Sequence, residues 1–429
     1  MKVNIPESDF PRIVIVGGGF AGIQLARSLR KAPYQVVLID KHNYHTFQPL
    51  LYQVATGGLE PDSIAFPLRK AFTSQKNMFF RMAEVQSIDA DVQSLETTLG
   101  SLSYDYLILA TGSKTNFFGM EEVEANAVGM KNVPEALDLR HMILQNFERF
   151  LQEPDTRELL QFVVVGGGPT GVETAGALAE LKRHVLPSDY PEIDWEKMEI
   201  TLVEAGPSLL GGMSEKSTRD ALKGLTNMGV KVELNTMVKD YNGSIVFTNE
   251  GEIPAGAVIW AAGIKGNLID GLEKMQTERG ARIVVDKYNR VSGYENIFAL
   301  GDLAFMETEA YPKGHPQVAP VAMQQGTLLA ENLIRESRKI PWKAFKYFDK
   351  GSMATIGRNK AVVDLGKLHL KGRLAWLAWM FIHLLFLIGF RNKLVVFVNW
   401  IWSYFTYDKG TRVIIRPFRK RTKEALPVT

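Results

Sequence analysis

Two stretches of sequence decide the fold: RIVIVGGGFAG at residues 12–22 and FVVVGGGPTG at residues 162–171. Each is a run of β-branched residues that ends in a glycine cluster and leads into a segment that favours a helix. A second pair of similar stretches, DYLILATG at 105–112 and AVIWAAG at 257–263, is typical of buried strands that end in a small residue and a glycine. The repetition predicts an α/β protein with two Rossmann-like dinucleotide-binding domains, the second inserted in the first.

The predicted domain limits follow from this repeat. The first dinucleotide-binding domain covers residues 1–115 and 266–335, and the chain returns to it through IFALGDLA at 297–304. The inserted dinucleotide-binding domain covers residues 116–265. Residues 336–429 form a separate C-terminal region, in which SMATIGRNKAVVDLG predicts two strands and two apolar segments follow.

The first glycine cluster has the spacing of a dinucleotide fingerprint, Gly17-x-Gly19-x-x-Gly22. Gly17 permits the tight turn, Gly19 lets the backbone approach a pyrophosphate, and Gly22 allows close packing of helix and strand. Asp40 ends the next strand, 18 residues after Gly22, where its carboxylate can accept hydrogen bonds from a ribose. The start of the helix presents free N–H groups to the phosphates.

The second glycine cluster, Gly166-x-Gly168-x-x-Gly171, has the same spacing. Glu204 ends the following strand, EITLVE, and an acid at this position accepts from a ribose 2′-hydroxyl but repels a 2′-phosphate. No arginine stands in 205–213 to bind such a phosphate. The pattern therefore favours NADH over NADPH at this second site.

The composition limits the chemistry further. A single fingerprint can be a plain strand–helix turn, but two in full context favour a tightly bound flavin with an exchangeable nicotinamide. The chain has no cysteine, which excludes disulfide frameworks, thiolate zinc sites, iron–sulfur ligation and dithiol redox chemistry. Redox chemistry must therefore reside on a bound cofactor. No spacing of His, Asp or Glu resembles a metal site, and we expect no metal.

The C-terminal region is basic and apolar, on a 429-residue chain whose net charge is only +3. Residues 371–429 contain eleven Lys and Arg against two acidic residues, and the segments 374–390 and 394–407 hold no formal charge. Both segments are short for a bilayer span, and four of the seven tryptophans lie in 376–402. We expect two helices at about 373–407 that lie in the interface of a membrane without spanning it.

Other interpretations of this region stay open. The two segments could form a buried hairpin or the seam of a homodimer. Binding of nucleic acid by the basic end is disfavoured, because it would leave the adjacent apolar segments without a role. The N-terminal sequence MKVNIPESDF has no apolar signal-peptide core, so we expect the protein on the cytoplasmic face of the membrane.

Four motifs give the chain a family resemblance. They are FQPLLYQVATGGLEPDSIA at 47–65, GGGPTGVETAG at 166–176, ALGD at 299–302 and APVAMQQG at 319–326. With the paired fingerprints, the sequence resembles the flavoproteins with two dinucleotide-binding domains, and among them the type II, non-proton-pumping NADH:quinone oxidoreductases. The resemblance covers nearly the whole chain. It implies a flavoenzyme that oxidises NADH through FAD and reduces a membrane quinone.

The resemblance also assigns cofactor-binding residues. The first domain would hold FAD and the inserted domain NADH. The residues implied for FAD are Gly17, Gly19, Gly22, Asp40, Gly112, Asp302, Val321 and Ala322. The residues implied for NADH are Gly166, Gly168, Gly171, Glu204 and Gly263.

Three residues are the candidates for catalysis. Glu173 matches the acid that the family places beside the flavin, although a carboxylate in the first turn of a helix is also favoured by the helix dipole alone. The family's quinone motif is Ala-Gln-x-Ala-x-Gln, but here Pro320 replaces its first Gln, which leaves Gln324 and Gln325 as the candidates for quinone contact. Pro320 itself suits the first turn of a helix. The two glutamines could instead only cap or solvate that helix.

Two other function classes share the fingerprints. One is a soluble NADH-dependent ferredoxin or rubredoxin reductase, for which the apolar C-terminal region would have no role. The other is a non-catalytic flavoprotein that responds to NAD(H) through partners. Sulfide:quinone and disulfide reductases are excluded by the absence of cysteine.

Overall fold

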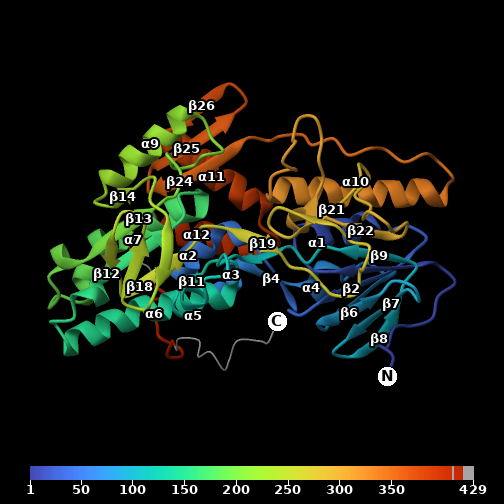
Figure 1. The fold of residues 1–429 in the computed structure, drawn as a ribbon, viewed down its shortest axis with the longest axis horizontal. Coiled ribbons are helices and arrows are strands. Elements are labelled where there is room, and N and C mark those ends of the chain that lie inside the picture. Colours follow the sequence, from blue (N-terminus) through green and yellow to red (C-terminus); the bar gives the residue numbers. More distant parts are fainter. Residues whose placement is uncertain (408–409, 419–429) are drawn as a thin grey trace. The chain divides into compact units, whose positions relative to one another are not determined.

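The computed structural model describes residues 1–407 and 410–418, which form two compact units (Figure 1). Unit 1 consists of Met1–His45, Phe66–Lys114 and Ile264–Lys350, and unit 2 of Thr46–Ala65, Thr115–Gly263 and the residues from Gly351 onward. Short strands mark most of the places where the chain passes from one unit to the other: β3 (Tyr44–Thr46), β4 (Ala65–Pro67), β10 (Ser113–Thr115) and β19 (Ile264–Gly266).

The core of unit 1 is a parallel five-stranded sheet with the order β22-β9-β1-β2-β5. Its strands are β1 (Arg12–Val16), β2 (Gln35–Asp40), β5 (Met78–Met82), β9 (Tyr106–Leu109) and β22 (Ile297–Ala299). Their Val, Ile and Leu side chains are mostly fully buried, as expected of a parallel sheet covered by helices. Strand β1 pairs with β2 on one side and with β9 on the other, so the strand order reverses at β1. Sheets of this kind bind ligands at such a reversal, next to the carboxyl ends of the strands.

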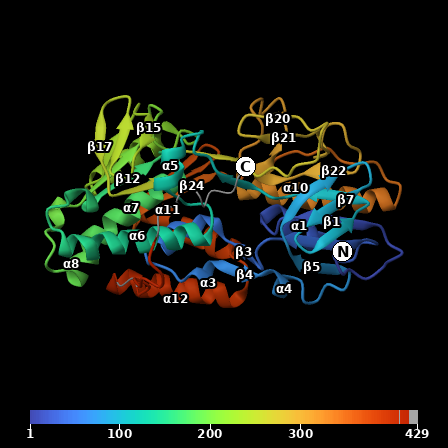
Figure 2. The same cartoon turned by 60° about the horizontal axis from the view of Figure 1, so that its bottom comes forward.

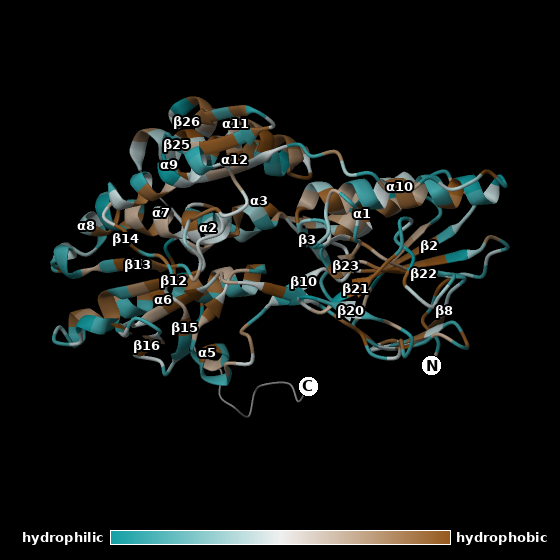
Figure 3. Ribbon diagram, turned by 45° about the horizontal axis from the view of Figure 1, so that its top comes forward, coloured by the Kyte–Doolittle hydropathy of each residue, from teal (hydrophilic) through white to brown (hydrophobic). Residues whose placement is uncertain are grey.

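Helices α1 (Phe20–Ser28) and α10 (Ala319–Ser337) of unit 1 pack side by side (Figure 3). Smaller elements complete the unit: α4 (Leu68–Ala71), η4 (Gly301–Leu303), β6 (Val85–Asp89), β7 (Ser94–Thr97), β8 (Gly100–Ser103), β20 (Thr277–Glu278), β21 (Arg282–Val284) and β23 (Ala304–Phe305).

Unit 2 repeats the same plan with the strand order β11-β18-β12-β13-β14, all parallel. The strands are β11 (Val128–Gly129), β12 (Gln161–Val165), β13 (Glu199–Val203), β14 (Lys231–Glu233) and β18 (Ala257–Trp260). Three helices of the repeat are α6 (Val133–Gln152), α7 (Pro169–His184) and α9 (Glu215–Thr226). The predicted pair of Rossmann-like sheets, with the second inserted in the first, is thus confirmed.

Short elements of unit 2 surround this sheet. They are η1 (Gln48–Leu50), α2 (Leu51–Ala55), α3 (Pro61–Ile64), α5 (Glu121–Asn126), η2 (Arg157–Leu160), α8 (Leu186–Asp189), η3 (Trp195–Lys197), β15 (Val238–Tyr241), β16 (Ile245–Thr248) and β17 (Glu252–Pro254).

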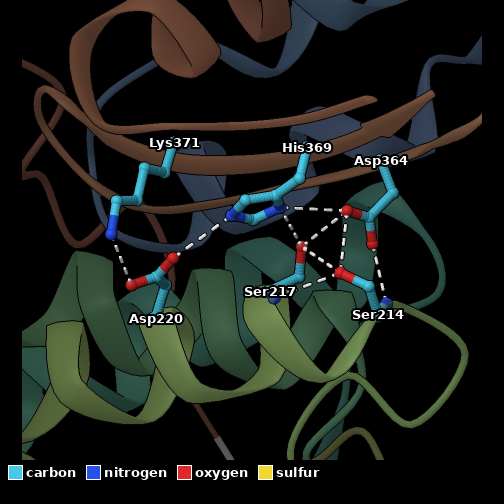
Figure 4. Close-up of polar contacts among 6 residues, drawn as sticks. All are labelled: Ser214, Ser217, Asp220, Asp364, His369 and Lys371. Atoms are coloured by element: carbon cyan, nitrogen blue, oxygen red, sulfur yellow. Dashed lines mark hydrogen bonds and ion pairs between the residues drawn. The ribbon is translucent and has the colours of Figure 1, made fainter. Parts of the chain in front are cut away.

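The C-terminal part of unit 2 begins with an antiparallel sheet of β24 (Ser352–Gly357), β25 (Lys360–Leu365) and β26 (Leu368–Lys371). Six side chains fasten β25 and β26 to the start of α9 (Figure 4). We call them the α9 clasp: Ser214, Ser217, Asp220, Asp364, His369 and Lys371. Because β26 leads directly into the next helix, the clasp fixes the point where the apolar segments begin.

The two apolar segments form α11 (Gly372–Phe386) and α12 (Phe390–Thr406), and α12 runs beside α3 (Figure 2). Both helices were expected, but the segments 374–390 and 394–407 implied a connection at 391–393, which is later than the observed turn. The turn is at 387–389, where Gly389 has φ +88°, and α12 already includes Arg391 to Lys393. Asn392 lies buried in this helix because its side chain donates to the carbonyl oxygens of Asp62, Ser63 and Ala65, each at 3.0 Å.

The compact units group two segments differently from the predicted domain limits. Residues 46–65 belong to unit 2, although the predicted first domain contains them, and the residues from 351 onward also join unit 2. The physical reason is packing between distant segments, since α2 packs on α6 and α7, and β24 packs along α7. As limits of the two nucleotide-binding functions, the predicted boundaries remain predictions.

Within residues 1–407 and 410–418, no helix combines the length and the apolar character needed to cross a bilayer.

Candidate nucleotide sites and a buried acidic pocket

The first glycine loop joins β1 to α1, and its three glycines have different surroundings. A Cβ on Gly17, which has φ +111°, would lie 2.2 Å from the carbonyl oxygen of Ala110, and one on Gly22 would lie 1.9 Å from the carbonyl oxygen of Gly17. A Cβ on Gly19 would meet no atom within 4 Å. Gly17 and Gly22 therefore allow close packing, whereas Gly19 borders open space at the start of α1.

Polar groups around this loop leave the helix end free for an anion. Gly19 is the N-cap residue of α1, and no side chain in the described part of the chain caps the helix there. The Asp40 carboxylate accepts from the N–H of Gly18 at 2.6 Å and from that of His42 at 2.7 Å, which holds the loop against the end of β2. Buried His45 contacts the carbonyl oxygen of Gly18 through Nδ1 at 3.0 Å and therefore helps to fix the position of the loop.

The second glycine loop, between β12 and α7, has the same construction. A Cβ on Gly166, also at φ +111°, would lie 2.6 Å from the carbonyl oxygen of Ala261, and one on Gly171 would lie 1.8 Å from that of Gly166. A Cβ on Gly168 would meet nothing within 4 Å. The Glu204 carboxylate accepts from the N–H groups of Gly167 at 2.5 Å and Gly206 at 2.6 Å, as Asp40 does in unit 1.

Two other predicted glycines follow the strands next to these loops. Gly112, after β9, has φ +68°, and a Cβ there would meet nothing within 4 Å. Gly263, after β18, packs against Phe118, whose ring would lie 2.8 Å from an added Cβ. Gly112 thus borders open space in unit 1, and Gly263 is covered by an aromatic ring in unit 2.

Asp302 lies in the short helix η4 of unit 1. Its carboxylate accepts from Ser113 Oγ at 2.7 Å, and Gln317 donates to its carbonyl oxygen at 2.8 Å. Gln325 is almost completely buried and accepts from the N–H of Gly301 at 2.7 Å. Gln325 thereby holds the turn that presents Asp302, and its contact with a quinone stays a prediction.

Helix α10 begins as Pro320 predicted, with this proline in its first turn and Val318 as the N-cap residue. Val321 is buried in the core of unit 1, and Ala322 lies against Gly301, where a Cβ would be 3.1 Å from that of Ala322. Gln324 binds the backbone of Phe348 with both ends of its side chain, at 2.9 and 3.0 Å. Contact of Gln324 with a quinone stays a prediction, and it would require release of Phe348.

Glu173 lies one turn further into its helix than expected. Helix α7 begins at Pro169, so Glu173 is outside the first turn and the helix dipole is not the reason for an acid here. The side chain is 8% exposed and accepts from the N–H of Thr355 at 3.3 Å. Burial raises the pKa of Glu173 to about 8, although Thr355 and the nearby indole of Trp379 favour the ionised form. Near pH 7 the carboxyl group is mostly protonated.

This acid lies in a pocket of about 110 Å³ inside unit 2. Its wall comes from α2, α7, β24, α11 and α12 and is rich in aromatic rings. The lining residues are Tyr52, Gln53, Thr56, Gly58, Glu173, Ala177, Glu180, Val185, Thr355, Gly357, Arg358, Trp376, Trp379, Met380, Trp400, Ser403, Tyr404 and Tyr407. An acid that stays neutral in an aromatic pocket can donate a proton to a flat, weakly polar ligand.

Sequence reasoning missed several residues of this pocket. Tyr52 stands in the quoted motif at 47–65 but had no assigned role; its pKa is raised, first by burial and then by Glu173. Trp379 was counted among tryptophans for a membrane interface, yet it is 1% exposed and stacks on His383 at 4.0 Å. The signal that could have found Trp379 is its place on the helix face opposite Leu377 and Phe381.

No cluster of His, Asp and Glu that could hold a metal ion exists among the described residues.

Comparison with known proteins agrees with this construction. Residues 11–326 match the pyridine nucleotide-disulphide oxidoreductase family, and residues 350–407 match the NDH2 C-terminal domain. The type II NADH:quinone oxidoreductase NdhA of Mycobacterium tuberculosis is 37% identical over 425 residues, which cover 94% of this chain and 89% of that protein. The type II NADH:quinone oxidoreductase of Staphylococcus aureus is 31% identical over 364 residues, covering 82% and 89%.

A solved structure has the same fold. The structure of NDH2 from Plasmodium falciparum in complex with NADH superposes with a TM-score of 0.85, covering 95% of this chain and all of that chain. The sequence identity is 23%, so this likeness concerns the fold.

Proposed function

The chain belongs to the type II NADH:quinone oxidoreductases, and on this premise we propose which of its residues serve the reaction of that family. The protein is a flavoenzyme that oxidises NADH with FAD and reduces a quinone, the reaction of a respiratory NADH dehydrogenase. FAD, when bound, supplies the two-electron chemistry that links the two substrates.

The residues proposed for FAD are those of unit 1. Gly19 borders the open side of the loop, so a pyrophosphate can approach the uncapped start of α1. Asp40 has lone pairs left for a ribose, and Gly112, Asp302, Val321 and Ala322 complete the set. Gly17 and Gly22 hold the strand and the helix close enough for this binding.

The residues proposed for NADH are those of unit 2. Gly168 borders the open start of α7, which has no side-chain cap, and Gly166, Gly171 and Gly263 shape the loop around it. Glu204 would accept from the ribose hydroxyl and would repel a 2′-phosphate. This carboxylate supports the preference for NADH over NADPH.

We assign the quinone to the aromatic pocket of unit 2. The observation that supports this assignment is Glu173, a buried acid with a pKa of about 8 among the rings of α11 and α12. Reduction of a quinone to a quinol takes up two protons, and the neutral carboxyl group can donate one of them at pH 7. Thr355 holds the carboxyl group in place.

A membrane surface is the proposed location, because α11 and α12 expose a row of large apolar side chains. The exposed members are Leu374, Leu377, Phe381, Leu385, Phe390, Leu394, Phe397, Val398, Ile401, Trp402 and Phe405. Their spacing of three, four and seven residues puts them on one face of each helix. An exposed apolar face of this extent is typical of a membrane or protein contact, and we propose the cytoplasmic face of a membrane.

A pocket-filling substitution tests the quinone assignment. Ala177 lies between Glu173 and Glu180 on the pocket face of α7, so Ala177→Phe would place a ring where the quinone is proposed to bind. We expect unchanged reduction of the flavin by NADH and at least a tenfold slower reoxidation by a short-chain quinone, measured by stopped-flow absorbance. Normal reoxidation by the quinone in a folded, yellow variant would show that the pocket is not the quinone site.

A further inference from the structure

Arg358, just after β24, is a cation in the pocket wall, and none of the residues that the structure describes forms an ion pair with its guanidinium. Its guanidinium carbon lies 4.2 Å from the ring centre of Tyr404 and 3.9 Å from that of Tyr407. Among the described residues, nothing accepts a hydrogen bond from its buried Nε and Nη1 atoms. A guanidinium is always charged and has five N–H donors, so unpaired donors inside a protein are costly. The arrangement calls for an acceptor, and residues 1–407 and 410–418 do not provide one for these two atoms.

The pocket extends along α7, and Arg358 marks one end of it. Glu173, Ala177 and Glu180 follow each other at intervals of four and three residues, so they share one face over about 10 Å of helix. Strand β24 runs beside this face. The N–H of Thr355 binds Glu173 at one end, and the N–H of Arg358 binds Glu180 at the other. The neutral acid and the guanidinium therefore belong to opposite ends of one aromatic pocket.

This inference rests on the proposed quinone assignment and adds a second polar contact to it. We propose that Arg358 is a quinone-binding residue whose guanidinium donates a hydrogen bond to one carbonyl oxygen of the quinone, while Glu173 faces the other. A 1,4-quinone carries its carbonyl groups on opposite sides of a flat ring, which matches polar groups at the two ends of an aromatic pocket. The hydrogen bond strengthens as the oxygen gains negative charge during reduction, because the donor is charged.

The two tyrosines explain why an arginine suits this position. Their rings hold the flat guanidinium by cation–π contact and limit its orientation, whereas a lysine ammonium would keep the charge without the planar donors. The proposed role of Arg358 is therefore to bind and orient the quinone, and proton donation is assigned to Glu173.

The experiment compares Arg358→Met, which removes charge and donors at similar length, with Arg358→Lys, which keeps the charge. Lys360→Met is the matched control, because Lys360 is an exposed cation two residues away on β25. Each variant is reduced with NADH and then reoxidised by a short-chain quinone at increasing concentration. We expect Arg358→Met to raise the half-saturating quinone concentration about tenfold, the size expected for one charged hydrogen bond. Arg358→Lys should recover part of this loss, and Lys360→Met should match the wild type.

In the alternative role, Arg358 only stabilises the packing of α12 through its contacts with Tyr404 and Tyr407. That role predicts a lower melting temperature and a lower maximal rate in Arg358→Met, with the half-saturating concentration unchanged, and this result would overturn the inference. Unchanged quinone dependence in Arg358→Met, together with loss of quinone reduction in Ala177→Phe, would reject Arg358 but keep the pocket. Normal quinone reduction in Ala177→Phe would reject the pocket itself. Should Arg358→Met not fold, Arg358→Gln gives the same comparison.

Discussion

At the scale of single residues, the environment of Glu173 predicts how the reaction depends on pH. Its pKa of about 8 means that the carboxyl group loses its proton as the pH rises through 8, so quinone reduction should fall above that pH. Glu173→Gln keeps the size but cannot donate a proton. We expect quinone reduction to be slower by about 100-fold and nearly independent of pH from 6 to 9, in keeping with the usual effect of a general acid.

Stopped-flow reoxidation of the reduced flavin by a short-chain quinone measures this profile. Ferricyanide, which accepts electrons without protons, serves as the control acceptor and should show no step at pH 8. The same group affects stability. Because the folded state holds a proton that the unfolded state has lost between pH 4.5 and 8, the free energy of unfolding of the wild type falls across this range, and Glu173→Gln should remove that slope. A wild-type rate that stays constant up to pH 9 would contradict the assignment of Glu173.

Other single residues show where sequence reasoning stops. The spacing of the two fingerprints predicted the positions of Gly19 and Gly168, because the strand–loop–helix geometry is local. Gln324 and Gln325 stand next to each other in one motif, yet one binds the backbone of Phe348 and the other supports Gly301. Such partners come from distant segments, so the pattern of residues alone could not separate a ligand contact from a structural one.

At the scale of elements, the α9 clasp should control how firmly α11 is attached. Asp364 on β25 accepts from the backbone N–H and the hydroxyl of Ser214, from Ser217 and from His369. Asp364→Ala would leave these donors without their shared acceptor and should lower the stability of unit 2 by about 2 kcal/mol. The measurement is thermal or urea unfolding, combined with limited proteolysis at the start of α11. Asp155→Ala, at an exposed aspartate of unit 2, is the control and should change neither.

Acid should have the same effect as this substitution. Burial alone would raise the pKa of Asp364, but hydrogen bonds from Ser214, His369 and Ser217 outweigh it and lower the pKa below the usual 3.8. A carboxylate with a lowered pKa stabilises the folded state above pH 3.8, and this stabilisation is lost as the pH falls further. The stability difference between the wild type and Asp364→Ala should therefore shrink in acid. A constant difference down to pH 3 would show that the clasp does not depend on this charge.

The boundaries of the C-terminal helices depend on buried polar residues whose partners the sequence pattern did not predict. The two uncharged segments of the sequence left 391–393 between them, but Asn392 anchors α12 to three carbonyl oxygens of α3 and β4. Two polar residues of the second segment also face inward, since Asn399 donates to Glu60 at 2.7 Å and Ser403 lines the pocket. Existence and type of both helices were predictable, whereas the partners of their polar faces were not.

At the scale of the whole molecule, the two compact units of the structure differ from the domains predicted along the sequence. The repeat of two nucleotide-binding sheets was predictable because each repeat has its own glycine loop. The apolar C-terminal region was expected to stand apart, but Trp379, Asn392 and Val396 are buried within unit 2. Removing this region would therefore expose a core and open the pocket, so deletion is a poor test of membrane binding.

Substitution of the exposed face tests membrane binding without this damage. Exchange of Phe381, Phe397, Trp402 and Phe405 for serine removes large side chains that are 44 to 78% exposed and leaves the buried face intact. Each such side chain contributes about 1.5–3 kcal/mol when it leaves water for an apolar environment, so four of them should decide binding. We expect the variant to stay in the supernatant when it is centrifuged with vesicles of anionic phospholipid, while the wild type sediments. NADH oxidation with ferricyanide should be unchanged.

The control and the salt dependence separate the membrane from the other partners of this face. Phe10→Ser changes an exposed aromatic residue of unit 1, 56% exposed, and should leave sedimentation unchanged. High salt should release only part of the wild type, because it screens the contribution of Arg373, Arg391 and Lys393 to binding at an anionic surface but leaves the apolar contact intact. If the fourfold variant instead still binds vesicles and changes from a dimer to a monomer by light scattering, the face is the seam of a homodimer. Membrane binding would then rest on the basic residues of the C-terminal region, because the substituted apolar face would not be needed for it.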